Sequence, residues 1–248
     1  NGVWVDYAAG NWSEGLTAYL ADHWMQARQG KGGQYRLKAL QRYSNFAAQG
    51  QDMPLADFVS RHNDATQSIG YSKSLMLFHM LRQSLGDDAF VDGLRNLWRK
   101  HCFRRIGFAE TLQAIAASKP ATARRLQSWL ERAGAPQLRL VDTRRSPLEG
   151  GWSLRLTIDQ TQPELFDFDL PVLITLEGEE HARREVARVS QRRTKLSYRF
   201  EQRPLRVDVD PEYDVLRYLD STEQPPALNR LFGGRQTWLV TPAAGSPE

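Results

Sequence analysis

The sequence predicts an α+β protein of 248 residues in which an all-α helical bundle is followed by an all-β sandwich. Up to about Pro136 apolar residues recur at the 3.6-residue period of helices, and beyond it they alternate with polar residues at the two-residue period of strands. With 41% hydrophobic and 25% charged residues, the chain can bury a core. We expect a helical part over 1–135, a sandwich over 136–221, and a linker with the start of a further segment over 222–248.

Only helices are expected in the first part, separated by glycine, proline and polar residues. The first helix is expected to begin after an N-cap at Ser13 and to end at the glycine-rich run 30–33. The other predicted helices cover 35–48, 54–61, 67–85, 88–101, 108–117 and 121–132.

The second part is expected to contain only strands. Alternating patterns predict strands at 138–141, 152–158, 172–176 and 205–209. Glycine and proline separate these runs at the spacing typical of a β-sandwich. We therefore expect six or seven short strands that stack as two sheets, and a further strand at 237–240 beyond the linker.

The distribution of charge argues against a nucleic acid partner, and the length of the apolar stretches argues against a membrane span. Residues 1–140 contain 18 Lys and Arg against 11 Asp and Glu, whereas residues 141–248 contain 15 against 18. The bases are scattered, with no run of five or more that would indicate a phosphate-binding arm, so we expect no nucleic acid partner. The longest nearly apolar stretch, 75–81, is far shorter than the ~20 residues of a membrane span, so no span is expected.

Common catalytic patterns are absent from the sequence. The five histidines stand far apart, no pair has the i, i+4 spacing of a zinc-binding helix, and H-E-x-x-H does not occur. The Gly-x-Ser-x-Gly turn of many serine hydrolases is also missing. Spacing alone therefore identifies no catalytic constellation.

Three segments nevertheless form a recognisable series. Residues 10–20 read GNWSEGLTAYL, residues 69–81 read IGYSKSLMLFHML, and residues 85–136 run from LGDDAF to SWLERAGAP. In order and separation they resemble the M1 family of zinc metallopeptidases, which includes aminopeptidase N and leukotriene A4 hydrolase. The first resembles the Asn-Glu-Gly helix that carries the third zinc ligand, and the second resembles the Tyr-Glu-Lys-Gly helix.

The resemblance implies a role for two residues. Glu14 would be the zinc ligand, and Tyr71 would be the catalytic hydroxyl that donates a hydrogen bond to the oxyanion of the tetrahedral intermediate. The helical part would be the C-terminal part of a thermolysin-like catalytic domain, and the sandwich would be the module that follows it. The sequence departs from the family pattern at Ser13, Ser72 and Ser74, which lie within three positions of these two residues in the sequence.

The same resemblance places the H-E-x-x-H helix roughly five to nine residues before Asn1. Both histidine ligands and the general base would then lie outside this chain. We expect the parent protein to be a zinc-dependent aminopeptidase that hydrolyses peptide substrates, and this chain alone to be inactive and free of zinc. The alternative is a non-catalytic protein-interaction module derived from such a peptidase.

Each singled-out residue also has an ordinary structural interpretation. Glu14 is an acid in a first helical turn, where the helix dipole favours it. Tyr71 would equally fit a core aromatic whose hydroxyl is satisfied. Lys73 and His79 are expected to be structural, with His79 as a hydrogen-bonded packing residue.

Overall fold

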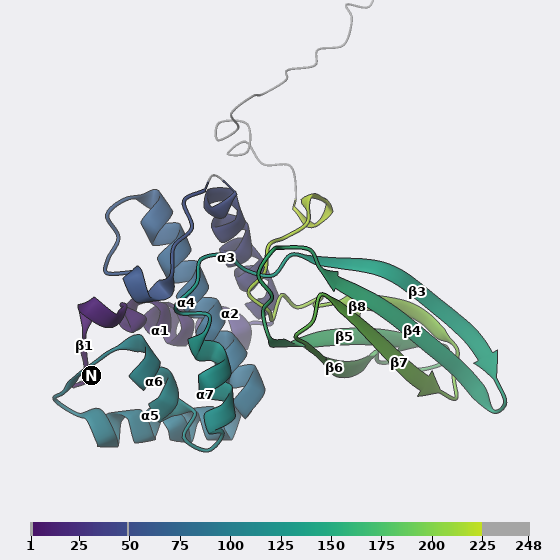
Figure 1. Ribbon diagram of the computed structural model, residues 1–248. Coiled ribbons are helices and arrows are strands. Elements are labelled where there is room, and N and C mark those ends of the chain that lie inside the picture. The colour runs from purple at the N-terminus through teal and green to yellow at the C-terminus, as the bar shows by residue number, and fades with distance from the viewer. Residues whose placement is uncertain (1, 49, 225–248) are drawn as a thin grey trace, which may run out of the picture.

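The computed structural model describes residues 2–48 and 50–224, with the helices gathered at one end of the molecule and the longer strands at the other (Figure 1). The first part contains β1 (Trp4–Val5), the 3-10 turn η1 (Tyr7–Ala9), α1 (Trp12–Ala18), the π-helical turn η2 (Tyr19–His23), α2 (Trp24–Arg28), α3 (Gly32–Ala47), the 3-10 turn η3 (Leu55–Asp57), α4 (Asp64–Leu85), α5 (Asp87–His101), β2 (Arg105–Ile106), α6 (Phe108–Ile115) and α7 (Pro120–Gln127).

The second part contains β3 (Leu138–Leu148), β4 (Gly151–Gln160), β5 (Phe168–Leu176), β6 (Arg183–Val189), β7 (Arg193–Phe200), β8 (Pro204–Val209) and the 3-10 turn η4 (Ser221–Glu223). Most of the predicted linker, and the strand predicted at 237–240, lie outside the described residues.

Helix α4 is the centre of the helical part. Asn63 and Thr66 form a reciprocal capping box at its start, in which the Thr66 backbone N–H donates to Asn63 Oδ1 at 2.8 Å. Its buried residues contact α1, α3, α5 and α7, so this one helix supports most of the others. In the described part of the chain, none of the helices combines the length and apolarity needed to cross a membrane.

A short parallel pair of strands corrects the prediction that the first part contains only helices. Trp4 of β1 lies opposite Arg105 of β2, about a hundred residues further along the chain. The Trp12 indole N–H donates to the Ile106 carbonyl at 3.0 Å, which fixes the start of α1 against this pair. Two-residue strands are too short to show a periodic pattern, so only the folded chain reveals them.

Several predicted helices also differ from those observed, and one of them, predicted at 121–132, ends at Gln127 as α7. Asn11, not Ser13, caps α1, because the Asn11 side chain accepts the Ser13 backbone N–H at 3.2 Å. The helix predicted at 54–61 is reduced to the single turn η3. The glycine-rich run does end α2, with Gly30 at φ 72°, but α3 already begins at Gly32.

The helix predicted from residue 13 onward is not a regular α-helix throughout. Between α1 and α2 the backbone widens into the π-helical turn η2. Within this turn the rings of Tyr19 and His23 stack, with centroids 4.8 Å apart and an interplanar angle of 16°. Both side chains are buried and therefore point into the helical part rather than into solvent.

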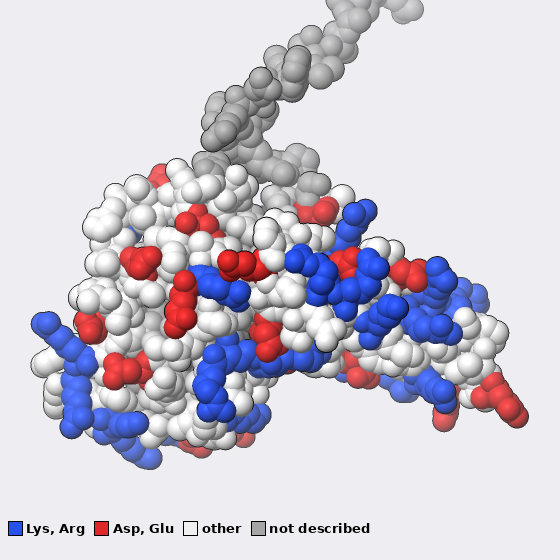
Figure 2. Space-filling model, viewed as in Figure 1, with Lys and Arg blue, Asp and Glu red and all other residues white. Residues whose placement is uncertain are grey.

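Six strands of more than two residues are present in the described ranges, in two antiparallel sheets ordered β3-β4-β7 and β6-β5-β8. Leu154 and Leu156 of β4 belong to one buried cluster with Val172 and Ile174 of β5. The inner side chains of the two sheets are therefore buried together. On the face seen in Figure 2, Lys and Arg form several groups with Asp and Glu between them.

Helices and strands share a second, larger hydrophobic core. The ring of Trp129 packs against Phe166, with centroids 4.6 Å apart, and both belong to a cluster that includes residues of α4 and β5. After β8 the chain turns back to the helices, and Val215 and Leu216 are buried in this same cluster. The segment that follows β8 is thereby brought against the helical part.

Candidate active site

Glu14 and Tyr71 meet at the surface of the helical part, although 57 residues separate them in the sequence. The Tyr71 hydroxyl donates a hydrogen bond to Oε2 of Glu14 at 2.5 Å. Both side chains are half-buried. The structure therefore brings together the two residues that the sequence motifs singled out.

The close approach of α1 to α4 makes this contact possible. A β carbon on Gly15 would lie 2.0 Å from the Ser74 β carbon, closer than two carbon atoms can stand. Only glycine allows α1 to pack this closely against α4. Because Glu14 precedes Gly15 and Tyr71 lies one turn before Ser74, the same approach brings the carboxylate to the phenol.

A loop between η3 and α4 supports the pair from the side. Phe58 packs edge-on against Tyr71, with ring centroids 6.0 Å apart and an interplanar angle of 68°. The Asn11 backbone N–H donates to the Phe58 carbonyl at 2.7 Å, and the Asn11 side-chain amide donates to the Val59 carbonyl at 2.8 Å. The residue that caps α1 thus also holds the ring that packs on Tyr71.

Glu14 and Tyr71 line a groove of about 590 Å³ between α1, α3 and α4. The other charged residues of its lining have both signs; they are Asp22, Lys38, Arg42 and Asp64. A groove of this size, with mixed apolar and charged walls, can hold a few residues of an extended peptide.

The environment of Tyr71 keeps its hydroxyl protonated. Partial burial, together with the hydrogen bond and negative charge of Glu14, raises the pKa of Tyr71 to about 12. At neutral pH the phenol is therefore a hydrogen-bond donor, which is the form needed to stabilise a developing oxyanion.

Glu14 fits one position of a zinc site. A carboxylate oxygen is a normal zinc ligand, and this one lines an accessible groove. Across residues 2–48 and 50–224, however, no three His, Cys, Asp or Glu side chains lie close enough to hold a metal ion. The described residues by themselves thus do not supply the three protein ligands of a catalytic zinc.

Lys73 has the structural role that the sequence analysis expected. It is buried, and its ammonium donates to Asp52 Oδ1 at 3.0 Å and to the Met53 carbonyl at 2.7 Å. The other oxygen of Asp52 accepts a hydrogen bond from Tyr43 at 2.7 Å. Asp52 was not anticipated, because nothing in its local sequence marks it.

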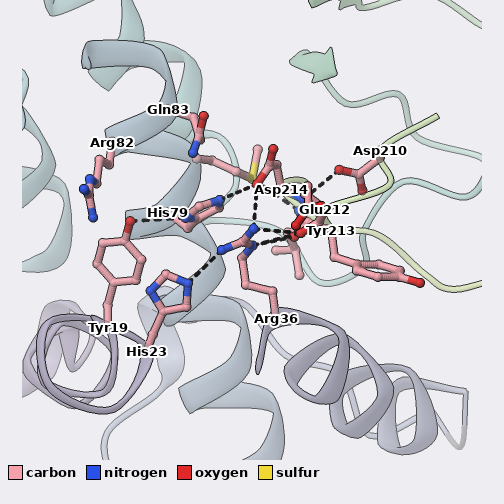
Figure 3. Close-up of polar contacts among 12 residues, drawn as sticks. Tyr19, His23, Arg36, His79, Arg82, Gln83, Asp210, Glu212, Tyr213 and Asp214 are labelled. Atoms are coloured by element: carbon pink, nitrogen blue, oxygen red, sulfur yellow. Dashed lines mark hydrogen bonds and ion pairs between the residues drawn. The ribbon is translucent and has the colours of Figure 1, made fainter. Parts of the chain in front are cut away.

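His79 is a hydrogen-bonded packing residue, as predicted, but its partners were not foreseen. Its Nδ1 lies 3.1 Å from the Tyr19 hydroxyl and its Nε2 lies 2.8 Å from Oδ1 of Asp214 (Figure 3). Asp214 comes from the segment after β8, 135 residues away. No local motif signals a contact over such a separation.

Comparisons with known proteins support a relationship to peptidases. No protein-family model matches the chain. A 99-residue stretch is 31% identical to aminopeptidase N of Lactococcus lactis subsp. lactis, covering 40% of this chain and 12% of that protein. The fold is similar to the crystal structure of Legionella pneumophila aminopeptidase A in complex with aspartic acid, with a TM-score of 0.55 at 15% identity. This alignment covers 92% of the chain and 27% of that structure, so the chain spans well under a third of either protein.

Proposed function

We propose that the chain is part of a zinc-dependent aminopeptidase, in which Glu14 is a zinc ligand and Tyr71 donates a hydrogen bond to the oxyanion formed from the scissile carbonyl. The contact between the Tyr71 hydroxyl and Oε2 of Glu14, at 2.5 Å beside the groove, carries this proposal. The partial similarity to an aminopeptidase N supports it. The substrate would be a peptide that enters along the groove.

The two residues have distinct tasks in this proposal. Zinc, when bound, would polarise the scissile carbonyl and activate a water molecule. Tyr71 has a single O–H, so it cannot donate to Glu14 and to the substrate at once. The hydrogen bond between Tyr71 and Glu14 must therefore open when a substrate carbonyl arrives, and the phenol then turns to the oxygen that gains charge.

We assign the remaining two zinc ligands and the general base to residues outside those the structure describes. His23 and His79, buried and hydrogen-bonded within the bundle, are already engaged with Arg36 and Asp214. The chain by itself is therefore proposed to hold no zinc and to be inactive.

Metal analysis of the protein with its natural flanking residues tests the assignment. We expect one zinc per chain, lost in Glu14→Ala and kept in Asp64→Ala, which removes another first-turn acid of the same groove. Tyr71→Phe should keep the zinc and lose most peptidase activity, because only the donor is removed. Zinc retained at full occupancy in Glu14→Ala would overturn the assignment.

The second candidate is a non-catalytic interaction module. It is favoured by one observation, that Oε2 of Glu14 already accepts a hydrogen bond from the Tyr71 hydroxyl. In that case the flanked protein would contain no zinc and cleave no peptides, and Glu14→Ala would change only its stability.

A further inference from the structure

A buried polar cluster lies between the helices of the candidate site and the segment after β8 (Figure 3). We call it the Asp214 cluster. Its members are all at most 6% exposed; they are Tyr19, His23, Arg36, His79 and Asp214. Buried polar groups in such number are tolerated only when they bond to one another, and the contacts between them are specific.

Asp214 is the centre of the cluster. Its Oδ1 lies 2.8 Å from His79 Nε2 on α4 and 3.0 Å from Arg36 Nη2 on α3. Its Oδ2 lies 3.0 Å from Arg184 Nη2 on β6. One carboxylate thus ties two helices to the strands.

Asp214 itself is held in place by its own segment. The Asp214 backbone N–H donates to Asp210 Oδ1 at 2.6 Å, and Asp210 also accepts from Arg217 Nε at 2.7 Å. Arg36 donates from Nη2 to the Glu212 carbonyl at 2.8 Å, which fixes the backbone of this turn against α3. These hydrogen bonds hold the turn that carries the Asp214 carboxylate in one conformation.

Two further bonds extend the cluster to the helix that carries Glu14. Arg36 Nη1 lies 2.8 Å from His23 Nε2, and the Tyr19 hydroxyl lies 3.1 Å from His79 Nδ1. Burial lowers the pKa of His79 to about 4, so the ring is neutral at pH 7. A neutral ring can donate from Nε2 to Asp214 and accept at Nδ1 from Tyr19.

The cluster lies close to both site residues along the chain. His79 follows Tyr71 by eight residues on α4, about two turns, and Tyr19 follows Glu14 by five residues. The π-helical turn η2 places Tyr19 and His23 in a stack, so that both reach the cluster. The Gly15 contact with Ser74 permits close packing but supplies no bond. The bonds of Asn11 and Trp12 hold the beginning of α1, whereas those of Tyr19 and His23 hold the turn that follows it.

We propose that Asp214 is a positioning residue for the Glu14 and Tyr71 pair, acting through His79, Arg36 and the stacked turn η2. The segment after β8 thereby fixes how α1 and α4 are placed relative to each other. This placement determines the distance between the Glu14 carboxylate and the Tyr71 hydroxyl. The importance of this distance for catalysis rests on the proposed function, whereas the positioning itself does not.

Another ion pair between the two parts of the molecule offers a matched control. Arg125 of α7 pairs with Asp169 of β5 at 2.7 Å, joining helices to strands as Asp214 does. Within the described ranges neither residue bonds to α1, η2 or α3, and on α4 both bond only to Ser84, near the end of the helix and beyond His79. Asp169→Asn therefore weakens the same junction but leaves the bonds of Asp214 to His79 and Arg36 in place.

The experiment measures the NMR chemical shift of the Tyr71 ring carbon that bears the hydroxyl, in the ¹³C-tyrosine-labelled full chain at neutral pH. Tyr71→Phe identifies the signal by removing it, and Glu14→Ala gives the chemical shift of this carbon when the carboxylate contact is lost. We expect Asp214→Asn, with an unchanged far-UV circular dichroism spectrum, to move the signal most of the way to that position. Asp169→Asn should leave it in place.

A folded Asp214→Asn protein whose Tyr71 signal does not move overturns the inference. An equal movement in Asp169→Asn also overturns it, because general loosening would then be the cause. If Asp214→Asn does not fold, Tyr19→Phe, which removes one hydroxyl, decides in the same way: a moved signal supports the inference and an unmoved one refutes it. The measurement needs neither zinc nor turnover, so its outcome is independent of the metal assignment.

Discussion

The backbone of Gly15 in α1 lies against Ser74 in α4 so closely that a β carbon on residue 15 would stand 2.0 Å from that of Ser74. This contact brings two helices together at the point where Glu14 and Tyr71 meet. The proposed site therefore requires a glycine at position 15 as well as the side chains of Glu14 and Tyr71.

Gly15→Ala should destabilise the protein and separate the pair. The added methyl group must push α1 away from α4, at a cost typical of overpacked cores, about 1–3 kcal/mol. Denaturant unfolding measures the loss. Thr17→Ala, on the exposed side of the same helix, is the control and should change the free energy of unfolding by less than about 0.5 kcal/mol. Equal stability of Gly15→Ala and the parent protein would contradict the packing described here.

Glu14→Ala should lower the pKa of Tyr71 from about 12 towards its ordinary value of 10.0. The carboxylate stabilises the protonated phenol by hydrogen bond and by charge, and both contributions disappear with it. A titration followed by NMR at Tyr71 measures the change. Asp64→Ala, in the same groove, should leave the pKa of Tyr71 where it is. A phenol that titrates identically in Glu14→Ala and parent protein would show that the contact is absent in solution.

Asp52→Ala should be far more destabilising than Lys73→Met. Removing Asp52 leaves the Lys73 ammonium buried without its counter-charge, which costs about 3–5 kcal/mol when a buried pair is broken in this way. Lys73→Met fills the space, and the Asp52 carboxylate that it leaves behind is less buried and still accepts hydrogen bonds from Tyr43 and the Gly134 backbone N–H. Chemical denaturation of both variants measures the two losses, and a larger loss in Lys73→Met would contradict the argument.

The Asp52→Ala variant should also recover stability as the pH rises above neutral. Burial lowers the pKa of Lys73, and loss of Asp52 lowers it further. The folded state then releases its proton at a lower pH than the unfolded state does. Because the unfolded state binds more protons over that interval, stability increases with pH. The parent protein, with Asp52 in place, should show a smaller rise over the same interval.

His79 should make the fold less stable as the pH falls from about 6.5 towards 4. Burial lowers the pKa of His79 from 6.5 to about 4, so in this window the unfolded state binds a proton that the folded state does not. Stability is then complete above pH 6.5 and declines below it, by roughly 1 kcal/mol per pH unit for one proton. Unfolding measured across this range tests the slope.

The contribution of His79 can be separated from those of its neighbours by substitution. Asp214, Arg36, Arg82, Tyr19 and His23 surround its ring. His23, with a pKa lowered by burial to about 3, shifts stability in the same direction, and Asp210, with a pKa raised by burial to about 6, shifts it in the opposite direction. His79→Gln should therefore flatten the slope relative to the parent protein. His181→Gln, at an exposed position, should not.

Much of the secondary structure could be predicted from local patterns. Helix α4 and helix α5 have long apolar periodicity, and both end within a few residues of the predicted positions. The four alternating runs all lie within observed strands. The failures are the turn at 55–57, the cap at Asn11, the end of α7 and the pair β1 and β2. Strands β6 and β7 were expected only as part of a number of strands, without ranges.

By itself, the sequence determined most of the longer helices and strands, because their periods depend on residues near one another in the chain. Glu14 and Tyr71 were singled out by the resemblance of two short segments to a known family. Only the tertiary structure decided that these two residues touch and that Asp214 joins the helices around them. Contacts over 57 or 135 residues arise from how helices and strands pack, and no local period records that packing.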